Sequence, residues 1–154
     1  MEQTKFEIRR AETLTPSLAE AFERLMPQLS ARLAPPDTRL AERMLGSGST
    51  ALLAACTGER IVGLLALAWY DVPSGRKAWI EDLVVEERAR RQGVGEALVK
   101  AALTHAEAVG AKQVMLTSNP ARSEAHALYR KVGFDKAETT LFVRKTEEKT
   151  EDKR

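Results

Sequence analysis

Two arginines and two glycines stand within one six-residue stretch of the sequence, RRQGVG at positions 90–95. Glycine has no side chain, so backbone N–H groups in such a stretch can approach a ligand closely. The arginines add mobile positive charge, and a helix that begins here adds unpaired N–H groups with a partial positive charge. Phosphate groups bind well to this combination. The stretch therefore predicts a pyrophosphate-binding turn.

The segments on either side of the turn are suited to hold it in place. Residues 79–85 (WIEDLVV) are rich in β-branched and aliphatic side chains and predict a strand. From position 94 to about 109 apolar residues recur at helical spacing, which predicts a helix. Residues 112–117 (KQVMLT) predict a further strand, so the order strand, helix, strand indicates a right-handed crossover and a locally parallel pair.

Composition narrows the class of protein. The chain has 154 residues, of which 44% are hydrophobic and 30% charged, with a net charge of +2. These values suit one soluble domain and give no reason, on charge alone, to expect nucleic-acid binding. The single cysteine, Cys56, leaves no partner for an intrachain disulfide and no cysteine cluster for a metal. The longest apolar run, 61–70, is too short to span a bilayer, and the first residues lack the order of a signal peptide.

We therefore expect a cytoplasmic protein with one domain over residues 1–145 and a charged, disordered tail over residues 146–154. Outside the segments already described, the pattern predicts two helices joined by a proline break, a β-hairpin, one further helix and two short final strands. A first strand is predicted at 5–10, the two helices at 16–30 and 38–45, and the hairpin at 50–56 with 60–70. The further helix is predicted at 121–131 and the final strands at 134–137 and 139–144. The two helices before the hairpin are of the adaptable kind that lines a substrate mouth, although a plain helical cover on a sheet explains them equally well.

Two other phosphate motifs do not fit the turn. A Walker A loop needs Lys and then Ser or Thr after its last glycine, but Gly95 is followed by Glu96 and Ala97. A dinucleotide fingerprint needs a third Gly or Ala where Leu98 stands. By itself the pattern R-x-x-G-x-G also suits an ordinary glycine-containing turn with solvated arginines.

The wider context of the turn is more specific. Residues 83–98, LVVEERARRQGVGEAL, resemble the acyl-CoA-binding motif of the GNAT superfamily of N-acyltransferases. Residues 118–134, SNPARSEAHALYRKVGF, resemble the second half of that family's signature, and the whole resemblance covers about residues 6–144. It implies an α+β (mixed α/β) fold. The sheet would be mixed but mostly antiparallel, with six to seven strands, a central splayed parallel pair and about four helices around it.

The resemblance also implies where acetyl-CoA binds. In such proteins the pantetheine arm enters the gap between the splayed strands, here 79–85 and 112–117, and pairs with exposed backbone. Asn119 matches the asparagine that commonly contacts pantetheine or reaches near the thioester. The expected cofactor-binding residues are those of the strand backbone, the phosphate turn and this asparagine: Leu83, Val84, Val85, Arg90, Arg91, Gln92, Gly93, Val94, Gly95 and Asn119. No metal is expected.

Tyr129 matches the tyrosine that in this family usually lies near the CoA sulfur. Aminolysis of a thioester expels a thiolate, and a phenol, whose pKa is ordinarily about 10, can donate a proton to it. The alternative is that Tyr129 only packs with Ala125, Leu128 and Val132. Helical spacing permits both roles.

Glu81 and Asp82 are the candidates for a general base. An alkyl amine is an ammonium ion at neutral pH and must lose a proton before it attacks, and the family often places a Glu in this region. Alternation along a strand gives Glu81 the same facing as Leu83 and Val85, toward the expected cleft, so Glu81 comes first and Asp82 second. A β-bulge would reverse this argument from facing, and a solvent-facing acidic pair is the alternative.

The leading hypothesis is an N-acetyltransferase that transfers an acetyl group from acetyl-CoA directly to a primary amine, on a small molecule or on a protein lysine or N-terminus. The alternative is a non-catalytic, regulatory acyl-CoA-binding module of the same fold. Nucleic-acid binding through Arg88, Arg90 and Arg91 is poorly supported, and neither a nucleic acid nor a membrane is expected as a partner. Homodimer formation is compatible with the sequence, although no interface stands out. The acceptor amine, and acetyl as opposed to another acyl group, do not follow from the sequence.

Overall fold

The computed structural model describes residues 5–146. Within them the chain forms five strands, four α-helices and one short 3₁₀ helix. In chain order these are β1 (Glu7–Ala11), α1 (Pro16–Leu29), α2 (Thr38–Leu45), β2 (Thr50–Thr57), β3 (Arg60–Val72), β4 (Gly75–Val85), the 3₁₀ helix (Glu87–Ala89), α3 (Val94–Ala108), β5 (Gln113–Met115) and α4 (Ser123–Lys131).

Local sequence explains where the first two helices begin. The hydroxyl of Thr15 accepts a hydrogen bond from the Leu18 N–H at 3.1 Å, and a proline occupies the first helical position of α1. The carboxylate of Asp37 accepts from the Leu40 N–H at 2.8 Å and caps α2 in the same way. Each cap satisfies an N–H group that the helix itself leaves without a partner.

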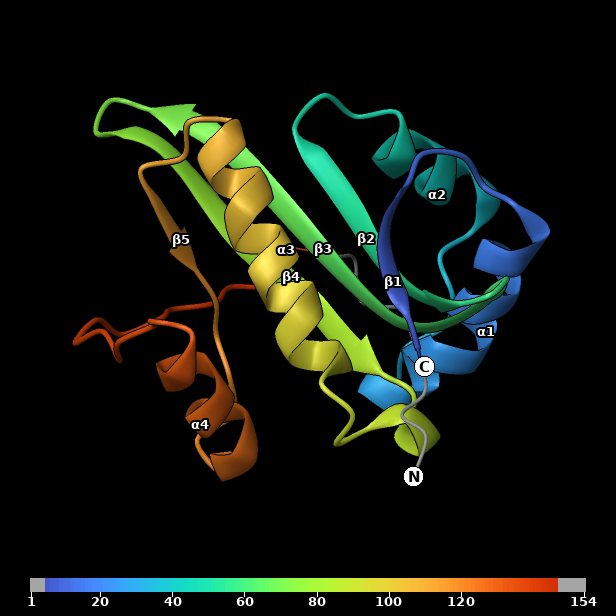
Figure 1. Cartoon of the computed structure of the whole chain (residues 1–154). Coiled ribbons are helices and arrows are strands. Elements are labelled where there is room, and N and C mark those ends of the chain that lie inside the picture. The colour runs from blue at the N-terminus through green and yellow to red at the C-terminus, as the bar shows by residue number, and fades with distance from the viewer. Residues whose placement is uncertain (1–4, 147–154) are drawn as a thin grey trace, which may run out of the picture.

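The strands form one sheet in the order β1-β2-β3-β4-β5. Neighbours from β1 to β4 are antiparallel, and β4 and β5 are parallel. The parallel pairing covers only three residue pairs and ends where Trp79 faces Met115, although β4 continues to Val85. The two strands therefore part, and the second half of β4 has no strand beside it on that side. The predicted mixed sheet with a splayed parallel pair is confirmed (Figure 1). The sequence predicted this pair at the centre of the sheet, but β5 is the last strand of the described sheet, so the pair lies at its edge.

The number of strands is five in the described residues, where the sequence predicted six to seven. Residues 134–137 and 139–144, predicted as the two final strands, form no strand. An apolar run becomes a strand only where a neighbouring backbone accepts its hydrogen bonds, and no pairing involves these residues. Phe142 is accordingly 89% exposed. β5 is also shorter than predicted, because its separation from β4 leaves the residues after Met115 unpaired.

The helices cover the two faces of the sheet. One apolar cluster lies between the sheet and α3, and a second lies between the opposite face and α1 with α2. α4 follows β5 at the edge of the sheet, on the far side of the molecule from α1 and α2 (Figure 1). None of the helices that the structure describes has the length and apolar character needed to cross a membrane. The predicted tail lies outside the described residues except for Thr146.

Candidate functional site

The predicted phosphate turn joins the end of β4 to the start of α3. Gly93 is the N-cap residue of α3 and has φ = +85°, a left-handed conformation that a side chain would strain. Arg91 also has a positive φ, +66°. No side chain caps α3, so the N–H groups of its first turn have no side-chain acceptor and remain open to an anion. These are the properties that the glycine pattern predicted for the turn.

The two arginines of the turn have different surroundings. Arg90 donates from Nε to the backbone carbonyl oxygen of Val85 at 3.0 Å, so its side chain ties the turn back to the end of β4. The side chain of Arg91 is 88% exposed, and its guanidinium lies 3.8 Å from the Glu124 carboxylate. Arg90 therefore helps to shape the turn, and the Arg91 charge is exposed to solvent.

Gly95 lies where three elements meet. A Cβ atom on this residue would lie 3.7 Å from a Val85 methyl group at the end of β4 and 3.7 Å from a Leu128 methyl group on α4. A Lys131–Glu96 ion pair of 3.0 Å also connects α4 with α3. The phosphate turn, the free end of β4 and the helix that carries Tyr129 are therefore neighbours in space.

A β-bulge interrupts β4 directly before this end. Leu64 of β3 pairs with Val84, and Ala66 pairs with Glu81, so Asp82 and Leu83 together stand opposite a single residue of β3. Asp82 takes up the extra residue with φ = +51°.

The bulge changes which way Glu81 faces. Glu81 lies on the same face as its partner Ala66 and as Val84, which pack toward α1 and α2. Leu83 and Val85 pack toward α3, on the other face. Simple alternation from these two residues thus predicts the wrong face for Glu81. The reason is that alternation assumes an unbroken register, and one extra residue reverses it.

Glu81 has the electrostatics of a potential base. Its side chain is exposed, yet partial desolvation raises the pKa of its carboxyl, and the negative charge of Asp82 raises it further. A raised pKa brings a carboxylate closer to the range in which it takes a proton effectively near neutral pH.

Tyr129 is half-buried on α4. Its ring meets Phe134 edge-on, with centroids 6.0 Å apart, and it packs at the border of the cluster around α3. Desolvation raises the pKa of the phenol, and the opposing charge of Arg122 lowers it by less. The phenol therefore keeps its proton at neutral pH. The packing alternative describes real contacts, and it does not conflict with a role as proton donor.

Asn119 shapes the connection between β5 and α4. Its side-chain oxygen accepts from the Ala121 N–H at 2.8 Å, and its backbone oxygen lies 3.0 Å from His126 Nε2. The preceding residue, Ser118, was missed by sequence reasoning. Its hydroxyl is buried and has no hydrogen-bond partner among the described residues. A lone serine has no diagnostic spacing, so only this unpaired group reveals it.

These features fit an extended ligand with a phosphate end and an amide-bearing arm. The uncapped start of α3 suits the phosphates, and the unpaired side of β4 beyond Trp79 suits an arm that hydrogen-bonds as a strand does. The buried Ser118 hydroxyl would gain a partner from such an arm. In residues 5–146 no group of three or more His, Cys, Asp or Glu side chains is placed to hold a metal ion.

The chain is similar to known proteins both in sequence and in fold. The model of the acetyltransferase (GNAT) family matches residues 15–134. N-acetyltransferase 8 of Homo sapiens is 33% identical over 86 residues, which cover 54% of this chain and 38% of that protein. GCN5-related N-acetyltransferase 6, chloroplastic, of Arabidopsis thaliana is 33% identical over 85 residues, covering 55% of this chain and 30% of that protein. The chain thus spans about a third of the length of the curated relatives it matches.

Solved structures share the whole fold. A protein described as a transcriptional regulator from Bacillus halodurans is 26% identical with a TM-score of 0.79, covering 91% of this chain and 99% of that one. A Trypanosoma brucei acetyltransferase is 25% identical with a TM-score of 0.75, covering 91% and 99%. An aminoglycoside N-acetyltransferase in complex with CoA has a TM-score of 0.76 at 20% identity, covering 94% and 97%, and this likeness concerns the fold alone. Because the family model spans both motifs and most of the described elements, the chain belongs to the acetyltransferase (GNAT) family.

Proposed function

We propose that this protein transfers an acetyl group from acetyl-CoA directly to a primary amine. The observation that carries the proposal is the continuity of two features. A strand whose outer side becomes free beyond Trp79 runs directly into a helix start that no side chain caps. CoA has the matching order of groups, with the pyrophosphate at one end of the pantetheine arm and the thioester at the other. Pyrophosphate at α3 therefore directs the thioester back along β4 toward the bulge.

Glu81, beside the bulge, and Tyr129, on α4, are proposed to supply the groups that aminolysis needs. The amine nitrogen attacks the carbonyl carbon of the thioester, so that a C–N bond forms and the C–S bond breaks. Glu81 takes the proton that the ammonium form of the amine loses before attack. The nitrogen gives a second proton to solvent as the amide forms, and Tyr129 gives its phenolic proton to the departing sulfur. Solvent then restores both groups. The backbone of residues 83–85 holds the arm in line, which places the carbonyl for attack.

The acceptor is proposed to be a cationic amine. Glu81 and Asp82 are both exposed beside the site, and adjacent carboxylates attract an ammonium group. The names of the curated relatives, which are N-acetyltransferases, support transfer to nitrogen. A small amine and a protein lysine or N-terminus are equally compatible with this chemistry.

The second candidate is a module that binds acyl-CoA without turnover. The specific observation in its favour is the description of the similar Bacillus halodurans structure as a transcriptional regulator. Such a module would use the same turn and would need neither Glu81 nor Tyr129.

Release of free thiol from acetyl-CoA, measured with a panel of primary amines and with an amine-free blank, separates the two functions. The enzyme releases thiol only with an accepted amine, and mass spectrometry finds that amine acetylated. Tight CoA binding with no turnover on any amine would support the module. Strong, salt-dependent DNA binding that CoA does not change, without turnover, would instead favour nucleic-acid binding.

A further inference from the structure

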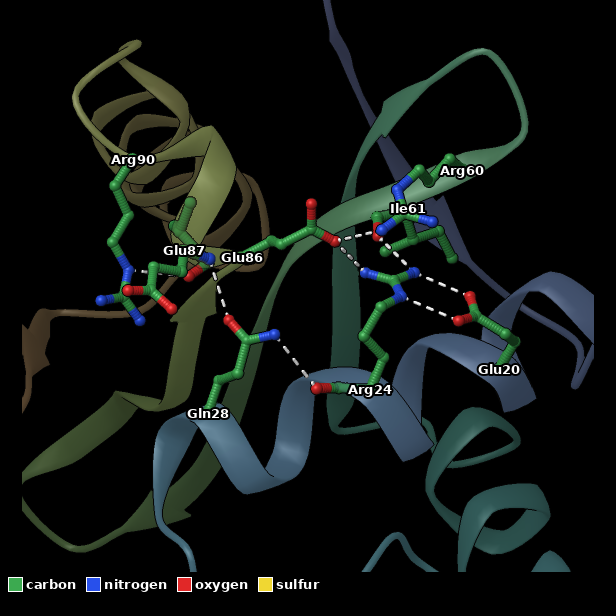
Figure 2. A network of polar contacts seen from close by, with 9 residues as sticks. Glu20, Arg24, Gln28, Arg60, Ile61, Glu86, Glu87 and Arg90 are labelled. Atoms are coloured by element: carbon green, nitrogen blue, oxygen red, sulfur yellow. Dashed lines mark hydrogen bonds and ion pairs between the residues drawn. The ribbon is translucent and has the colours of Figure 1, made fainter.

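Glu86 is a buried carboxylate that the proposed reaction does not use. It follows β4 directly, is 7% exposed, and is the one charged or polar residue that is buried among those the structure describes. Arg24 of α1 and Arg60 of β3 both donate to the same carboxylate oxygen, Arg60 at 2.7 Å. Figure 2 shows the two guanidinium groups converging on Glu86 from different elements.

α1 also holds Glu87, the residue after Glu86. Gln28, one helical turn after Arg24, accepts a hydrogen bond from the Glu87 N–H at 2.9 Å and donates to the Arg24 carbonyl oxygen at 3.3 Å. Arg24 is itself held by both oxygens of Glu20, at 2.7 and 2.8 Å, and donates to the Ile61 carbonyl oxygen at 2.9 Å. Glu86 and Glu87, the first two residues after β4, are thus held to α1 by Arg24 and Gln28 (Figure 2). The side chains of Arg24 and Gln28 are held by further hydrogen bonds.

Stability alone is a weak reason for such a network. A buried ion pair often contributes no more to stability than apolar residues of the same volume, because its charges must leave water. Hydrogen-bonded charges instead fix the position of the backbone segment that carries them. The segment that follows needs a defined position, because Arg91, a non-glycine residue, adopts a left-handed backbone conformation that costs free energy.

Apart from the exposed 3.8 Å ion pair of Arg91 with Glu124 of α4, the other side-chain contacts of this segment with polar groups are local. Arg90 reaches back to Val85, and Gln92 donates to the Arg88 carbonyl oxygen at 3.3 Å. Beyond these, the Glu86 N–H donates to the Val62 carbonyl oxygen at 2.8 Å. The side chains that connect residues 86–93 to the rest of the described fold by hydrogen bonds therefore come from α1 and β3.

We propose that Glu86, together with Arg24, Arg60 and Gln28, is a positioning device that holds the phosphate turn in its CoA-binding shape. This inference rests on the proposed function. None of the four residues is assigned to the reacting atoms. Because α1 packs on the face of the sheet where Glu81 lies, the device also connects the acceptor side of the site to its cofactor side.

CoA affinity tests this role when it is compared with a ligand that lacks the phosphates. The variants are Glu86→Gln, which removes the charge shared by two arginines, and Gln28→Leu, which removes the acceptor of the Glu87 N–H. Glu7→Gln is the matched control, since Glu7 forms an exposed ion pair with Arg9 at 3.0 Å on β1. Titration calorimetry gives the Kd for CoA, thermal unfolding gives the folded fraction, and thiol release gives kcat/KM with S-acetylpantetheine, which has no pyrophosphate.

We expect Gln28→Leu to weaken CoA binding by about threefold to tenfold, the range for loss of one hydrogen bond, and Glu86→Gln to weaken it by more. Turnover of S-acetylpantetheine should change by less than about twofold, and the control should match the wild type. Equal losses with both ligands would overturn the proposal, as would unchanged CoA affinity. If Glu86→Gln does not fold, Gln28→Leu decides alone.

A wild-type protein that binds no CoA would refute the proposed function and not, by itself, the positioning role. Hydrogen exchange of the ligand-free proteins then provides the decision. Faster exchange confined to residues 86–95 in both variants supports the device. Exchange that is unchanged there, or faster throughout the protein, overturns it.

Discussion

The two helices that border the candidate site, α3 and α4, differ in how much apolar surface they bury against the rest of the protein. α3, which begins at the phosphate turn, buries an apolar stripe against the sheet: Val94, Leu98, Val99, Ala102 and Ala106. α4, which carries Tyr129, buries no residue fully. It meets the rest of the protein through the Leu128 methyl near Gly95, the Lys131–Glu96 pair and the edge contact of Tyr129 with Phe134.

This contrast indicates that cofactor binding and turnover depend on parts of different rigidity. α3 packs into the core, so the turn at its start should keep its shape without ligand. α4 can shift at small cost, because few buried contacts oppose its movement. Variants in the two helices should therefore separate stability and CoA affinity from the rate of acetyl transfer.

The largest contrast is expected in stability. Leu98→Ala should lower the free energy of unfolding by about 2–5 kcal/mol, because Leu98 is completely buried and its loss leaves a cavity. Leu128→Ala, in half-exposed α4, should cost about 1 kcal/mol or less. Urea unfolding followed by circular dichroism measures both. Equal costs would show that α4 is as firmly packed as α3.

Turnover should show the reverse order. Tyr129→Phe removes only the hydroxyl and keeps the ring contact with Phe134, so stability and the Kd for CoA should stay near those of the wild type. Loss of a general acid should lower kcat by about 100-fold. Because desolvation raises the phenol pKa, the wild type holds this proton at neutral pH and loses it only in alkaline solution, where its rate should fall. Steady-state kinetics across pH should find that alkaline fall missing in the variant. An unchanged kcat would leave Tyr129 a packing residue.

The sequence predicted α3 and the turn before it better than the parts of the site that depend on distant contacts. The glycine-containing turn and the start of α3 depend on contacts within a few residues, so local pattern is enough to predict them. The resemblance to one family then supplied the splayed strands and the order of the elements, which local pattern alone does not determine.

The features that sequence missed depend on contacts distant in the chain. The bulge at Asp82 is defined by the register of β4 against β3, and no local pattern marks it. The final segments alternate like strands, yet no strand of the described sheet pairs with them. The partners of Glu86 lie on α1 and β3, and the unpaired hydroxyl of Ser118 is visible only from burial.

A smaller effect tests the rigidity of the turn. Gly93→Ala places a Cβ at φ = +85° and should lower the free energy of unfolding by about 1 kcal/mol. CoA affinity should weaken by about fivefold if the turn relaxes to relieve this strain. Gly48→Ala is the matched control, because the site has open space and no positive φ. Urea unfolding and calorimetry with CoA give the two quantities, and losses of the same size in both variants would rule out a special conformation at Gly93.

The smallest effect concerns the electrostatics of the bulge. Asp82→Asn keeps a residue type that tolerates the left-handed conformation, so the bulge should persist. The Asp82 charge is the second of two causes that raise the Glu81 pKa, after desolvation. A base works only when deprotonated, so kcat/KM rises as pH passes through its pKa. Removal of the Asp82 charge lowers that pKa, and the acid limb should move to lower pH with little change in the plateau. Kinetics with one amine, for which the ionisation of the acceptor stays the same, measures the displacement. Glu81→Gln should abolish the limb that Asp82→Asn only displaces. A limb that stays in place in both variants would assign it to the acceptor amine and remove Glu81 as the base.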